Sequence, residues 1–287
     1  MQQINNKTPS VEEINSVAFL GPEATFSHEA AMSLFESSVT YRSADSIEEV
    51  FGLVLEGLCP YGVVPVENAY EGSVRDTLDL LYQYDVKIRA EAIRRIRQHL
   101  LSRASHLGQI VRLYSHPMAI AQCRNWIKDH LVGIPIREVA STALAAKMAS
   151  NEPAASAIGC LLAGRTYHLN ILKENIEDAP DNFTRFLVIG KYPARPTGKD
   201  KTTFLFLPRP GPHTLVQALG ALARRNIILT RIEARPTREK KWEYLFFVDV
   251  EGHEEEGQVG DALREIESLS VFLKRLGSYP SGKESGD

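Results

Sequence analysis

Short apolar runs alternate with helical patterns of apolar residues over residues 16–190. SVAFLG (16–21), YGVVPVEN (61–68) and VRLYSH (111–116) are typical of buried strands. The stretch 47–55 instead places apolar residues at i, i+3, i+4, i+7 and i+8, which predicts a helix with one buried face. The pattern restarts near residue 111, so the chain predicts two successive α/β runs with parallel sheets.

The pattern changes after residue 190. Residues 191–200, KYPARPTGKD, combine proline, glycine and charge without periodicity and predict a linker. Beyond the linker, strands are predicted at 201–207, 226–234, 242–250 and 271–276, with amphipathic helices after the first and the third. The order β-α-β-β-α-β is typical of a ferredoxin-like unit.

The charge balance of the 287 residues narrows the choice of partner. Lys and Arg total 33 against 36 Asp and Glu, which gives a net charge of −3. Proteins that hold nucleic acid or an anionic membrane on a basic surface carry an excess of positive charge, and this chain does not. The composition therefore favours a small-molecule partner, with no nucleic acid and no membrane.

The cysteines and the N-terminus predict a cytoplasmic protein. Cys59, Cys123 and Cys160 are far apart and odd in number, so neither a disulfide framework nor a zinc site is indicated. The polar N-terminus lacks the apolar core of a signal peptide. No apolar run is long enough to cross a bilayer.

Polar residues collect where predicted strands end and helices begin. These points are 21–27, 67–73, 115–117 and 141–142. Open α/β sheets bind ligands outside the carboxyl ends of their strands, and helix N-termini there suit carboxylates or phosphates. The alternative is that each point is an ordinary helix cap.

Common catalytic and nucleotide-binding motifs are absent from the sequence. It contains no GxGxxG, no GxxxxGK[ST], no GxSxG and no HExxH. His28 and His116 lie near predicted helix starts, where we expect capping or surface histidines rather than metal ligands. Arg185, in the unusual segment DNFTRF (181–186), could form a structural ion pair or bind a carboxylate.

Five ordered motifs give the chain a resemblance to a known family. They are GPEATFSHEAA (21–31), VVPVENAYEGSV (63–74), YSHPMAIAQC (114–123), STALAA (141–146) and DNFTRFLVIG (181–190). In this order they resemble prephenate dehydratase, and TRIEARP (230–236) resembles the ESRP segment of that family's ACT domain. The resemblance extends from about residue 17 to 280.

The resemblance implies an α/β catalytic domain like a type II periplasmic binding protein, followed by a ferredoxin-like ACT domain. Its active site would lie in the cleft between two lobes. The expected segments are a tail at 1–16, a catalytic domain at 17–190 (lobes at about 17–95 plus 175–190 and at 96–174), a linker at 191–200, an ACT domain at 201–280 and a tail at 281–287.

The implied reaction converts prephenate to phenylpyruvate, water and carbon dioxide in phenylalanine biosynthesis. Loss of the ring hydroxyl together with the ring carboxylate makes the ring aromatic, which supplies the driving force. General-acid assistance and positioning are what the enzyme must add. No metal, nucleotide or redox cofactor is required, so we expect none.

The resemblance also implies roles for individual residues. Thr184 would donate a hydrogen bond or proton to the leaving hydroxyl, within a network. Glu67, Asn68, Ser115 and Gln122 would orient the substrate, although Glu67 and Asn68 could instead be a clamp between strand and helix. The remaining cleft residues would be Thr25, Phe26, Ser27, Ser141, Thr142, Asn182, Arg185 and Phe186.

Two segments of the ACT part correspond to the family's phenylalanine site. They contain His213, Thr214, Leu215, Glu233, Ala234, Arg235 and Pro236. His213 stands where the family usually has glycine, and its side chain would crowd a ligand that approaches the backbone. Ala234 replaces the serine of ESRP. Feedback inhibition by L-phenylalanine is therefore a hypothesis.

Other readings remain open. The substrate could be arogenate, which carries an amine in place of the side-chain keto group. A non-catalytic protein that binds small anions could share the bilobal fold. By resemblance we expect a monofunctional dehydratase that forms a homodimer or homotetramer through its ACT domains.

Overall fold

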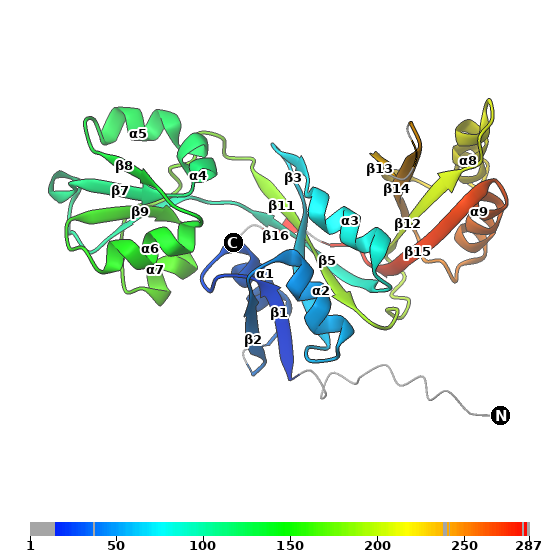
Figure 1. Ribbon diagram of the computed structural model, residues 1–287, viewed down its shortest axis with the longest axis horizontal. Coiled ribbons are helices and arrows are strands. Elements are labelled where there is room, and N and C mark those ends of the chain that lie inside the picture. Colours follow the sequence, from blue (N-terminus) through cyan, green and yellow to red (C-terminus); the bar gives the residue numbers. More distant parts are fainter. Residues whose placement is uncertain (1–14, 37, 238–239, 241, 283, 286–287) are drawn as a thin grey trace.

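The computed structural model describes residues 15–36, 38–237, 240, 242–282 and 284–285. Three units follow one another along its long axis (Figure 1), and each is built on its own sheet. We call them the first lobe, the second lobe and the C-terminal unit. No helix in the described ranges is long and apolar enough to cross a membrane.

The first lobe is a mixed sheet with strand order β16-β5-β11-β3-β1-β2, to which β4 adds beside β3. Its elements are β1 (Ser16–Leu20), α1 (Phe26–Leu34), β2 (Thr40–Ala44), α2 (Ile47–Leu55), β3 (Tyr61–Asn68), β4 (Gly72–Ser73), α3 (Arg75–Gln83), β5 (Lys87–Arg95), β11 (Phe183–Gly190) and β16 (Glu284–Ser285). Strands β2, β1 and β3 are parallel, whereas β11 is antiparallel to both β3 and β5. The helix predicted at 47–55 is confirmed as α2, and Ser46 caps it by accepting from the Glu49 amide.

The second lobe is a five-stranded sheet of order β10-β6-β9-β7-β8. Its elements are β6 (His99–Ser102), the 3-10 turn η2 (Leu107–Gln109), β7 (Arg112–Ser115), α4 (Pro117–Gln122), α5 (Arg124–His130), β8 (Ile136–Glu138), α6 (Thr142–Ser150), β9 (Ala155–Gly159), α7 (Leu161–Thr166) and β10 (Asn170–Lys173). The chain passes from the first lobe to the second between β5 and β6, and it returns between β10 and β11. These two crossings join the lobes.

The C-terminal unit has the predicted βαββαβ order, which is confirmed. It consists of β12 (Asp200–Pro208), α8 (Thr214–Ala223), β13 (Leu229–Pro236), β14 (Tyr244–Glu251), α9 (Gly257–Ser268) and β15 (Ser270–Pro280). Its antiparallel sheet has the order β13-β14-β12-β15. Helices α8 and α9 cover the outer face of this sheet (Figure 1), where Phe204, Phe206 and Val248 form an apolar core with them.

The inner face of the C-terminal sheet packs against the first lobe. Leu205, Phe247 and Leu276 share one apolar core with Leu78 of α3 and Leu187 of β11. Burial of apolar surface on both sides of this contact favours a fixed arrangement of the two units.

Strand β15 runs four residues beyond the predicted end at 276. Gly277 has φ +142°, and a Cβ there would lie 2.6 Å from the carbonyl oxygen of Ile88. The glycine therefore serves a close approach between the C-terminal unit and β5 rather than a turn. The extension brings the fully buried Tyr279 against the first lobe.

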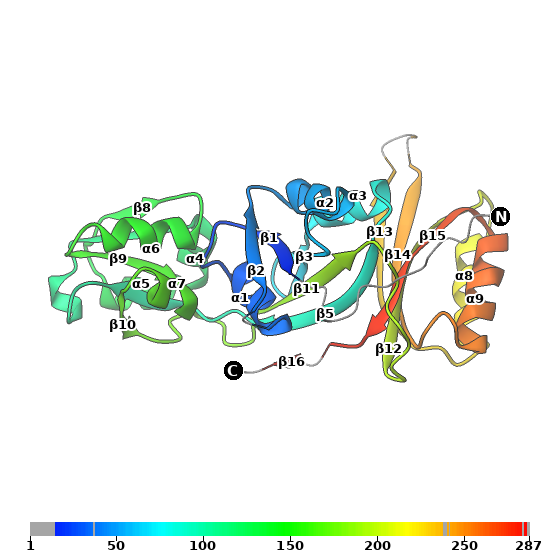
Figure 2. The same ribbon diagram turned by 90° about the horizontal axis from the view of Figure 1, so that it is seen from below.

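Each predicted tail overlaps a strand of the first-lobe sheet. The N-terminal tail 1–16 lies outside the described residues except for its last two, and Ser16 already begins β1. In the segment 281–287, expected to be a tail, residues 284–285 form β16, which pairs in parallel with Ile93 and Arg94 of β5. Figure 2 shows this last strand returning beside the first-lobe sheet.

A buried charge cluster lies between the first lobe and the C-terminal unit. Arg185 of β11 is 2.6 Å from Glu91 of β5 and 2.5 Å from Asp249 of β14, and its Nη2 donates to the Tyr279 hydroxyl at 2.9 Å. Lys201 also contacts Glu91, at 2.6 Å. Burial opposes the charge of Arg185, but Tyr279, Asp249 and Glu91 outweigh it and raise the pKa of the guanidinium.

The cluster predicts a large stability effect. Arg185→Met keeps the aliphatic stem but leaves Glu91 and Asp249 buried without their shared cation, so the free energy of unfolding falls by about 3–5 kcal/mol. Urea denaturation measures the change. Arg264→Met breaks an exposed ion pair with Asp261 on α9, and it leaves the unfolding midpoint unchanged. Equal unfolding midpoints for the two variants would contradict the stabilising role of Arg185 in the buried charge cluster.

Candidate active site

A cavity of about 340 Å³ lies between the two lobes. The first lobe contributes Phe26, Ser27, Pro65, Asn68, Glu71, Val74, Thr184 and Phe186 to its lining. The crossing from β5 to β6 contributes Ile96 and Gln98, and the second lobe contributes His116, Met118, Ala119, Gln122, Ala140, Ser141 and Thr142. The cleft therefore brings together residues from every sequence motif except the ACT segment.

Asn68 and Thr184 form the polar centre of the cleft. The side-chain oxygen of Asn68 accepts from the backbone amides of Tyr70 at 2.9 Å and of Glu71 at 3.2 Å. Because backbone amides can only donate, this contact fixes which end of the Asn68 amide is nitrogen. That nitrogen donates to the Thr184 Oγ1 at 2.8 Å, which leaves the Thr184 hydroxyl hydrogen available for another acceptor.

A β-bulge determines which side chains of β3 reach the cleft. In the pairing with β11, Arg185 is opposite Glu67 and Phe186 is opposite Pro65, so Val66 is the extra residue. After this shift, Asn68 lies on the same face as Thr184, its direct neighbour across the ladder. The bulge therefore aims Asn68 at the cleft.

The second lobe presents two helix starts to the cleft. Ser141 caps α6 by accepting from the Leu144 amide at 3.0 Å, and His116 caps α4 through Nδ1, which accepts from the Met118 amide at 3.2 Å. His116 is the capping histidine that we expected. The positive end of α6, with Ser141 and Thr142 beside it, suits a carboxylate.

Three polar residues that line the cleft, His116, Glu71 and Gln98, were not among the sequence candidates. His116 was assigned only a capping role, whereas Glu71 lies at the tip of the β3–β4 hairpin, three residues after Asn68. Partial burial raises the pKa of the Glu71 carboxyl, and the nearby His116 acts to lower it. Gln98 donates to the Gln122 side chain at 3.0 Å. The motif ENAYEGS contains Glu71 and could have indicated it; nothing in the sequence indicates Gln98.

Glu67 and Arg185 are corrected by the structure, because neither lines the cleft. Both lie on the reverse face of β3 and β11, toward the C-terminal unit. Glu67 is 3.1 Å from the Arg231 Nε, and Arg185 is part of the buried charge cluster. Of the two roles left open for Arg185, the ion pair is the one the structure contains.

Ser115, Thr25 and Asn182 also differ from expectation. Ser115 is fully buried and donates to the Ile158 carbonyl at 3.2 Å, so it supports the sheet of the second lobe. Thr25 caps α1 by accepting from the His28 amide and does not line the cavity. Asn182 is 2% exposed, and its side-chain oxygen accepts from the Asn68 side-chain nitrogen at 2.9 Å. It therefore holds the Asn68 side chain in place without lining the cavity.

The residues expected at a phenylalanine site do not converge within one chain. Thr214 and Leu215 line a cavity of about 380 Å³ beside Trp242 and Tyr244. In β13, however, Ala234 and Pro236 are exposed, while the side chains of Glu233 and Arg235 contact Ser73 and Asp79 of the first lobe. The expectation for Glu233 and Arg235 is therefore corrected: their side chains face the first lobe.

His213 adopts a backbone conformation that favours glycine. Its φ is +72°, in the left-handed region, and it immediately precedes α8 without a side-chain capping bond. An L residue there costs about 1–2 kcal/mol relative to the right-handed region. The geometry fits the glycine that the resemblance implies for this position.

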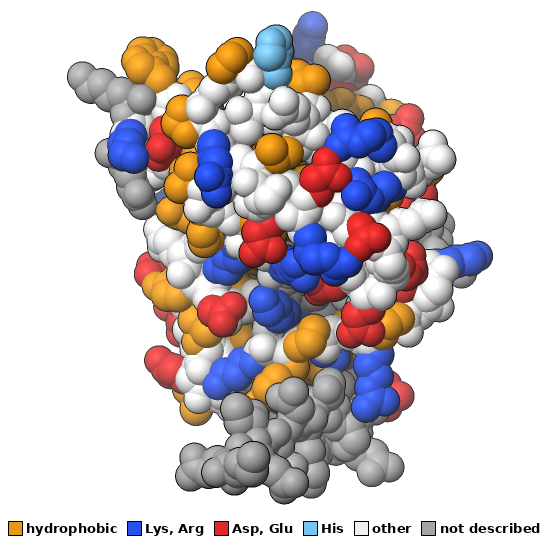
Figure 3. Space-filling view, turned by 90° about the vertical axis from the view of Figure 1, so that its right-hand side faces the viewer, with side chains coloured by type: hydrophobic (Ala, Val, Ile, Leu, Met, Phe, Trp, Pro, Cys, Tyr) orange, Lys and Arg blue, Asp and Glu red, His pale blue; other side chains and the backbone are white. Residues whose placement is uncertain are grey.

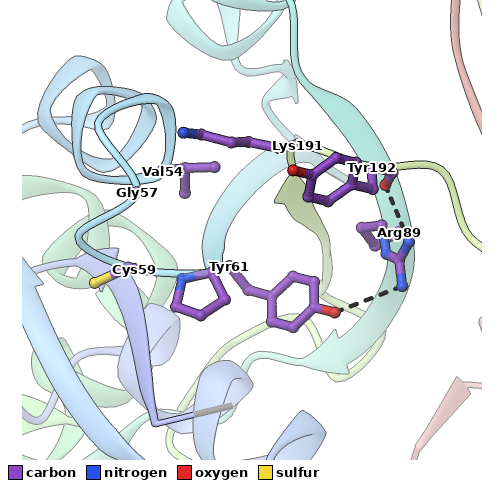
Figure 4. A pocket seen from close by; sticks show the side chains of 8 residues that line it. Val54, Gly57, Cys59, Tyr61, Arg89, Lys191 and Tyr192 are labelled. Carbon is purple, nitrogen blue, oxygen red and sulfur yellow. Dashed lines mark hydrogen bonds between the residues drawn. The ribbon is translucent and has the colours of Figure 1, made fainter. Parts of the chain in front are cut away.

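A third cavity, of about 190 Å³, lies at the opposite end of β3 (Figure 4). Its wall includes Tyr61, at the start of β3, and Arg89, which donates to the carbonyls of Tyr192 and Pro193. Seven residues of extended strand, about 23 Å, separate Tyr61 from Asn68. Arg89 thus anchors the start of the 191–200 segment, and this cavity is separate from the cleft.

Within the part of the chain that the structure describes, no group of three or more His, Cys, Asp or Glu side chains is placed to hold a metal ion.

The fold and the cleft define a class of protein: a two-lobed α/β domain with a cavity between its lobes, followed by a βαββαβ unit. The prephenate dehydratase family model matches residues 17–194, and the ACT domain model matches residues 211–268. The chain therefore belongs to the prephenate dehydratase family, and its C-terminal unit is an ACT domain.

The chain is similar to known proteins over most of its length. The chain is 47% identical to a bifunctional chorismate mutase/prephenate dehydratase of Aquifex aeolicus, over 94% of this chain and 75% of the relative. A solved prephenate dehydratase of Arthrobacter aurescens in complex with L-Phe is 34% identical, with a TM-score of 0.84, over 92% of this chain and 89% of that one. A structure described as GqqA, a novel type of quorum-quenching acylase, is 30% identical, with a TM-score of 0.85, over 93% of this chain and 98% of that one.

The position of Ser115 generates a prediction. Ser115→Ala removes a buried hydrogen bond to a carbonyl but no cleft group, so it lowers the free energy of unfolding by about 1 kcal/mol. It leaves turnover of the enzyme's substrate unchanged. Thermal unfolding and steady-state kinetics measure the two effects. A large loss of turnover in a folded variant would return Ser115 to the active site.

Proposed function

We propose that the protein converts prephenate to phenylpyruvate, with release of water and carbon dioxide, in the cleft between its lobes. Membership of the prephenate dehydratase family supports this activity. The observation that carries it is the Asn68–Thr184 pair, which places a hydroxyl donor with its hydrogen free at the centre of the cleft. The ring hydroxyl leaves as water only with a proton, and the Thr184 hydroxyl is a donor through which that proton can reach it.

The cleft also suits the rest of the substrate. Phe26, Phe186 and Pro65 provide apolar surface for the six-membered ring. Ser141 and Thr142, at the start of α6, provide hydroxyls and the positive end of a helix for a carboxylate. The described lining contains His116 but no Lys or Arg, so the carboxylates bind mainly through hydrogen bonds, without a permanently charged partner.

The chemistry follows from these groups. The ring C–O bond breaks, and the oxygen leaves as water after receiving a proton through the Thr184 hydroxyl network. The C–C bond to the ring carboxylate breaks at the same time, and its electron pair completes the aromatic ring as carbon dioxide leaves. Because the carboxylate loses its charge in this step, a strong ion pair would stabilise the ground state more than the transition state. A site that holds it by hydrogen bonds avoids that cost.

Feedback inhibition by L-phenylalanine through the ACT domain is part of the proposal. The ACT match and the L-Phe complex of the Arthrobacter relative support it. The cavity at Thr214 and Leu215 supplies apolar and aromatic surface for a phenyl ring, and His213 borders that segment.

A homodimer or homotetramer is proposed to form through the ACT domains. Strand β13 lies at an edge of the ACT sheet, where Ile228, Leu229 and Ile232 are exposed. Figure 3 views the molecule from the side of α8 and α9, and there acidic and basic side chains are interspersed. Ion pairs such as Arg225–Glu265 belong to that helical face, so β13 is the better surface for a second copy.

The proposal includes a reducing, cytoplasmic setting. Cys59, Cys123 and Cys160 are all buried free cysteines. Burial also raises the pKa of Cys160 to about 12, with Glu29 acting in the same direction, so its thiol stays protonated and unreactive at neutral pH. Unpaired thiols are typical of proteins that work in reducing compartments.

An assay with purified protein tests the activity. Prephenate and arogenate are offered in parallel at neutral pH, without added cofactor, because prephenate aromatises spontaneously in acid. We expect phenylpyruvate from prephenate. If only arogenate reacts, and phenylalanine is its product, the substrate is arogenate rather than prephenate. Hydrolysis of an N-acyl amide without turnover of either compound would contradict the proposed activity.

Thr184 gives a matched pair of variants. Thr184→Ala removes the hydroxyl and lowers kcat by about 100-fold or more, because the leaving hydroxyl loses its donor. Thr184→Ser keeps the hydroxyl, and most turnover is retained. Steady-state kinetics at neutral pH measure both. Near-normal turnover in the alanine variant would remove Thr184 from the mechanism.

His213 gives a prediction about regulation. His213→Gly relieves the left-handed backbone and opens the approach to the start of α8, so half-inhibition requires about 10-fold less phenylalanine. Activity titrated with phenylalanine measures this, and His106→Gly, in the second lobe, is the control. An unchanged titration curve in H213G would show that His213 does not limit binding.

A further inference from the structure

One hairpin carries both Asn68 and Glu71 into the cleft. It consists of the end of β3, the turn 69–71 and β4, with Glu67 paired to Ser73 and Asn68 paired to Gly72. The turn is held to Asn68 by the Tyr70 and Glu71 amides. The position of this hairpin therefore sets the position of the Asn68 amide, which in turn orients Thr184.

A single arginine of the ACT domain contacts both arms of this hairpin. Arg231 of β13 has its Nε 3.1 Å from the Glu67 carboxylate and its Nη2 2.7 Å from the Ser73 hydroxyl. Glu233, two residues further along the same strand, contacts both Ser73 and Arg231. The Arg231 side chain is only 12% exposed. Its planar guanidinium can bridge two acceptors in fixed directions, as a lysine cannot.

Strand β13 separates this contact from the outer surface of the ACT domain. Arg231, Glu233 and Arg235 point toward the first lobe, whereas Ile232 and Ala234 between them are exposed. A ligand or a second copy that moves the exposed side of β13 must move Arg231 as well. The hairpin is the part of the active site that Arg231 holds.

We infer that Arg231 is a positioning residue of the active site, and that the ACT domain alters turnover by moving Arg231 and the hairpin 67–73. The inference rests on the proposed dehydratase activity. It assigns no chemical step to Arg231, which contacts the hairpin and not the cleft. Instead, binding of a ligand or a second copy to β13 changes the position of Arg231, and through the hairpin it changes the positions of Asn68 and Thr184.

The chain offers a matched control. Arg235 lies on the same strand, faces the same way and forms an ion pair of 2.6 Å with Asp79 of α3, with its side chain also 12% exposed. Asp79 does not line the cleft. Asp79→Asn therefore weakens a contact between the same two domains without touching the hairpin.

The experiment compares Arg231→Met, Arg231→Lys and Asp79→Asn in the full chain. Arg231→Met lowers kcat for prephenate about 10- to 100-fold, because small displacements of catalytic groups are costly. KM changes less, since the cleft surfaces remain. Phenylalanine no longer changes the residual rate. Arg231→Lys recovers part of kcat, and Asp79→Asn retains the parent kcat, KM and phenylalanine response.

A second measurement does not depend on activity. Hydrogen exchange of the peptide containing Tyr70 and Glu71 reports whether their amides stay bonded to Asn68. Exchange there is at least about 10-fold faster in Arg231→Met than in the parent, and unchanged in Asp79→Asn. Because this readout needs no substrate, a protein that fails to turn over prephenate refutes the proposed activity without obscuring the role of Arg231.

Two results would overturn the inference. One is an Arg231→Met variant with parent kcat, parent phenylalanine response and unchanged exchange at Tyr70 and Glu71. The other is an Asp79→Asn variant that loses kcat and hairpin protection equally, since that would make any loosened domain contact sufficient.

Discussion

The structure depends on the burial of two carboxylates, Glu91 and Asp249, on sheets of two different domains. Neither can be buried as an anion without a cation, and Arg185 contacts both. The guanidinium is planar and its donors point in fixed directions, so the two sheets can meet in only a narrow range of relative positions. Leu205, Phe247 and Leu276 pack against the first lobe and supply the buried apolar surface of the contact. The charge cluster sets the position of one sheet relative to the other.

Strands β3 and β11 face the cleft on one side and the ACT domain on the other, because side chains alternate across a sheet. Asn68 and Thr184 face the cleft, while their chain neighbours Glu67 and Arg185 face the ACT domain. One peptide unit thus separates a residue of the cleft from a residue of the domain contact. The same two strands form a wall of the cleft on one face and part of the contact with the ACT domain on the other.

The sequence predicted the elements well and the faces poorly. Helical periodicity and the βαββαβ order were readable because they are local, and the motifs located Asn68 and Thr184 in the cleft. Glu67 was misplaced because its facing depends on the bulge at Val66, which is a property of pairing between β3 and β11. Arg185 was misplaced because it follows Thr184 directly on β11, where successive side chains point to opposite faces. The predicted last strand stopped at residue 276, because the reason for Gly277 is a close approach to the Ile88 backbone, far away in sequence. Motifs give positions along the chain; tertiary pairing decides what those positions touch.

The pairing of β16 with β5 bears on how freely such domains can be exchanged. After completing the ACT domain, the chain returns to the first-lobe sheet, where 284–285 shield the edge of β5 and the Gly282 amide donates to Glu91. The ACT domain is therefore inserted between β11 and β16, two strands of the first-lobe sheet, rather than added at the end of the chain. A chimera that replaces everything after residue 200 removes a strand of the catalytic sheet, exposing an edge open to pairing with other chains. A modular exchange has to keep 281–285 with the catalytic lobe.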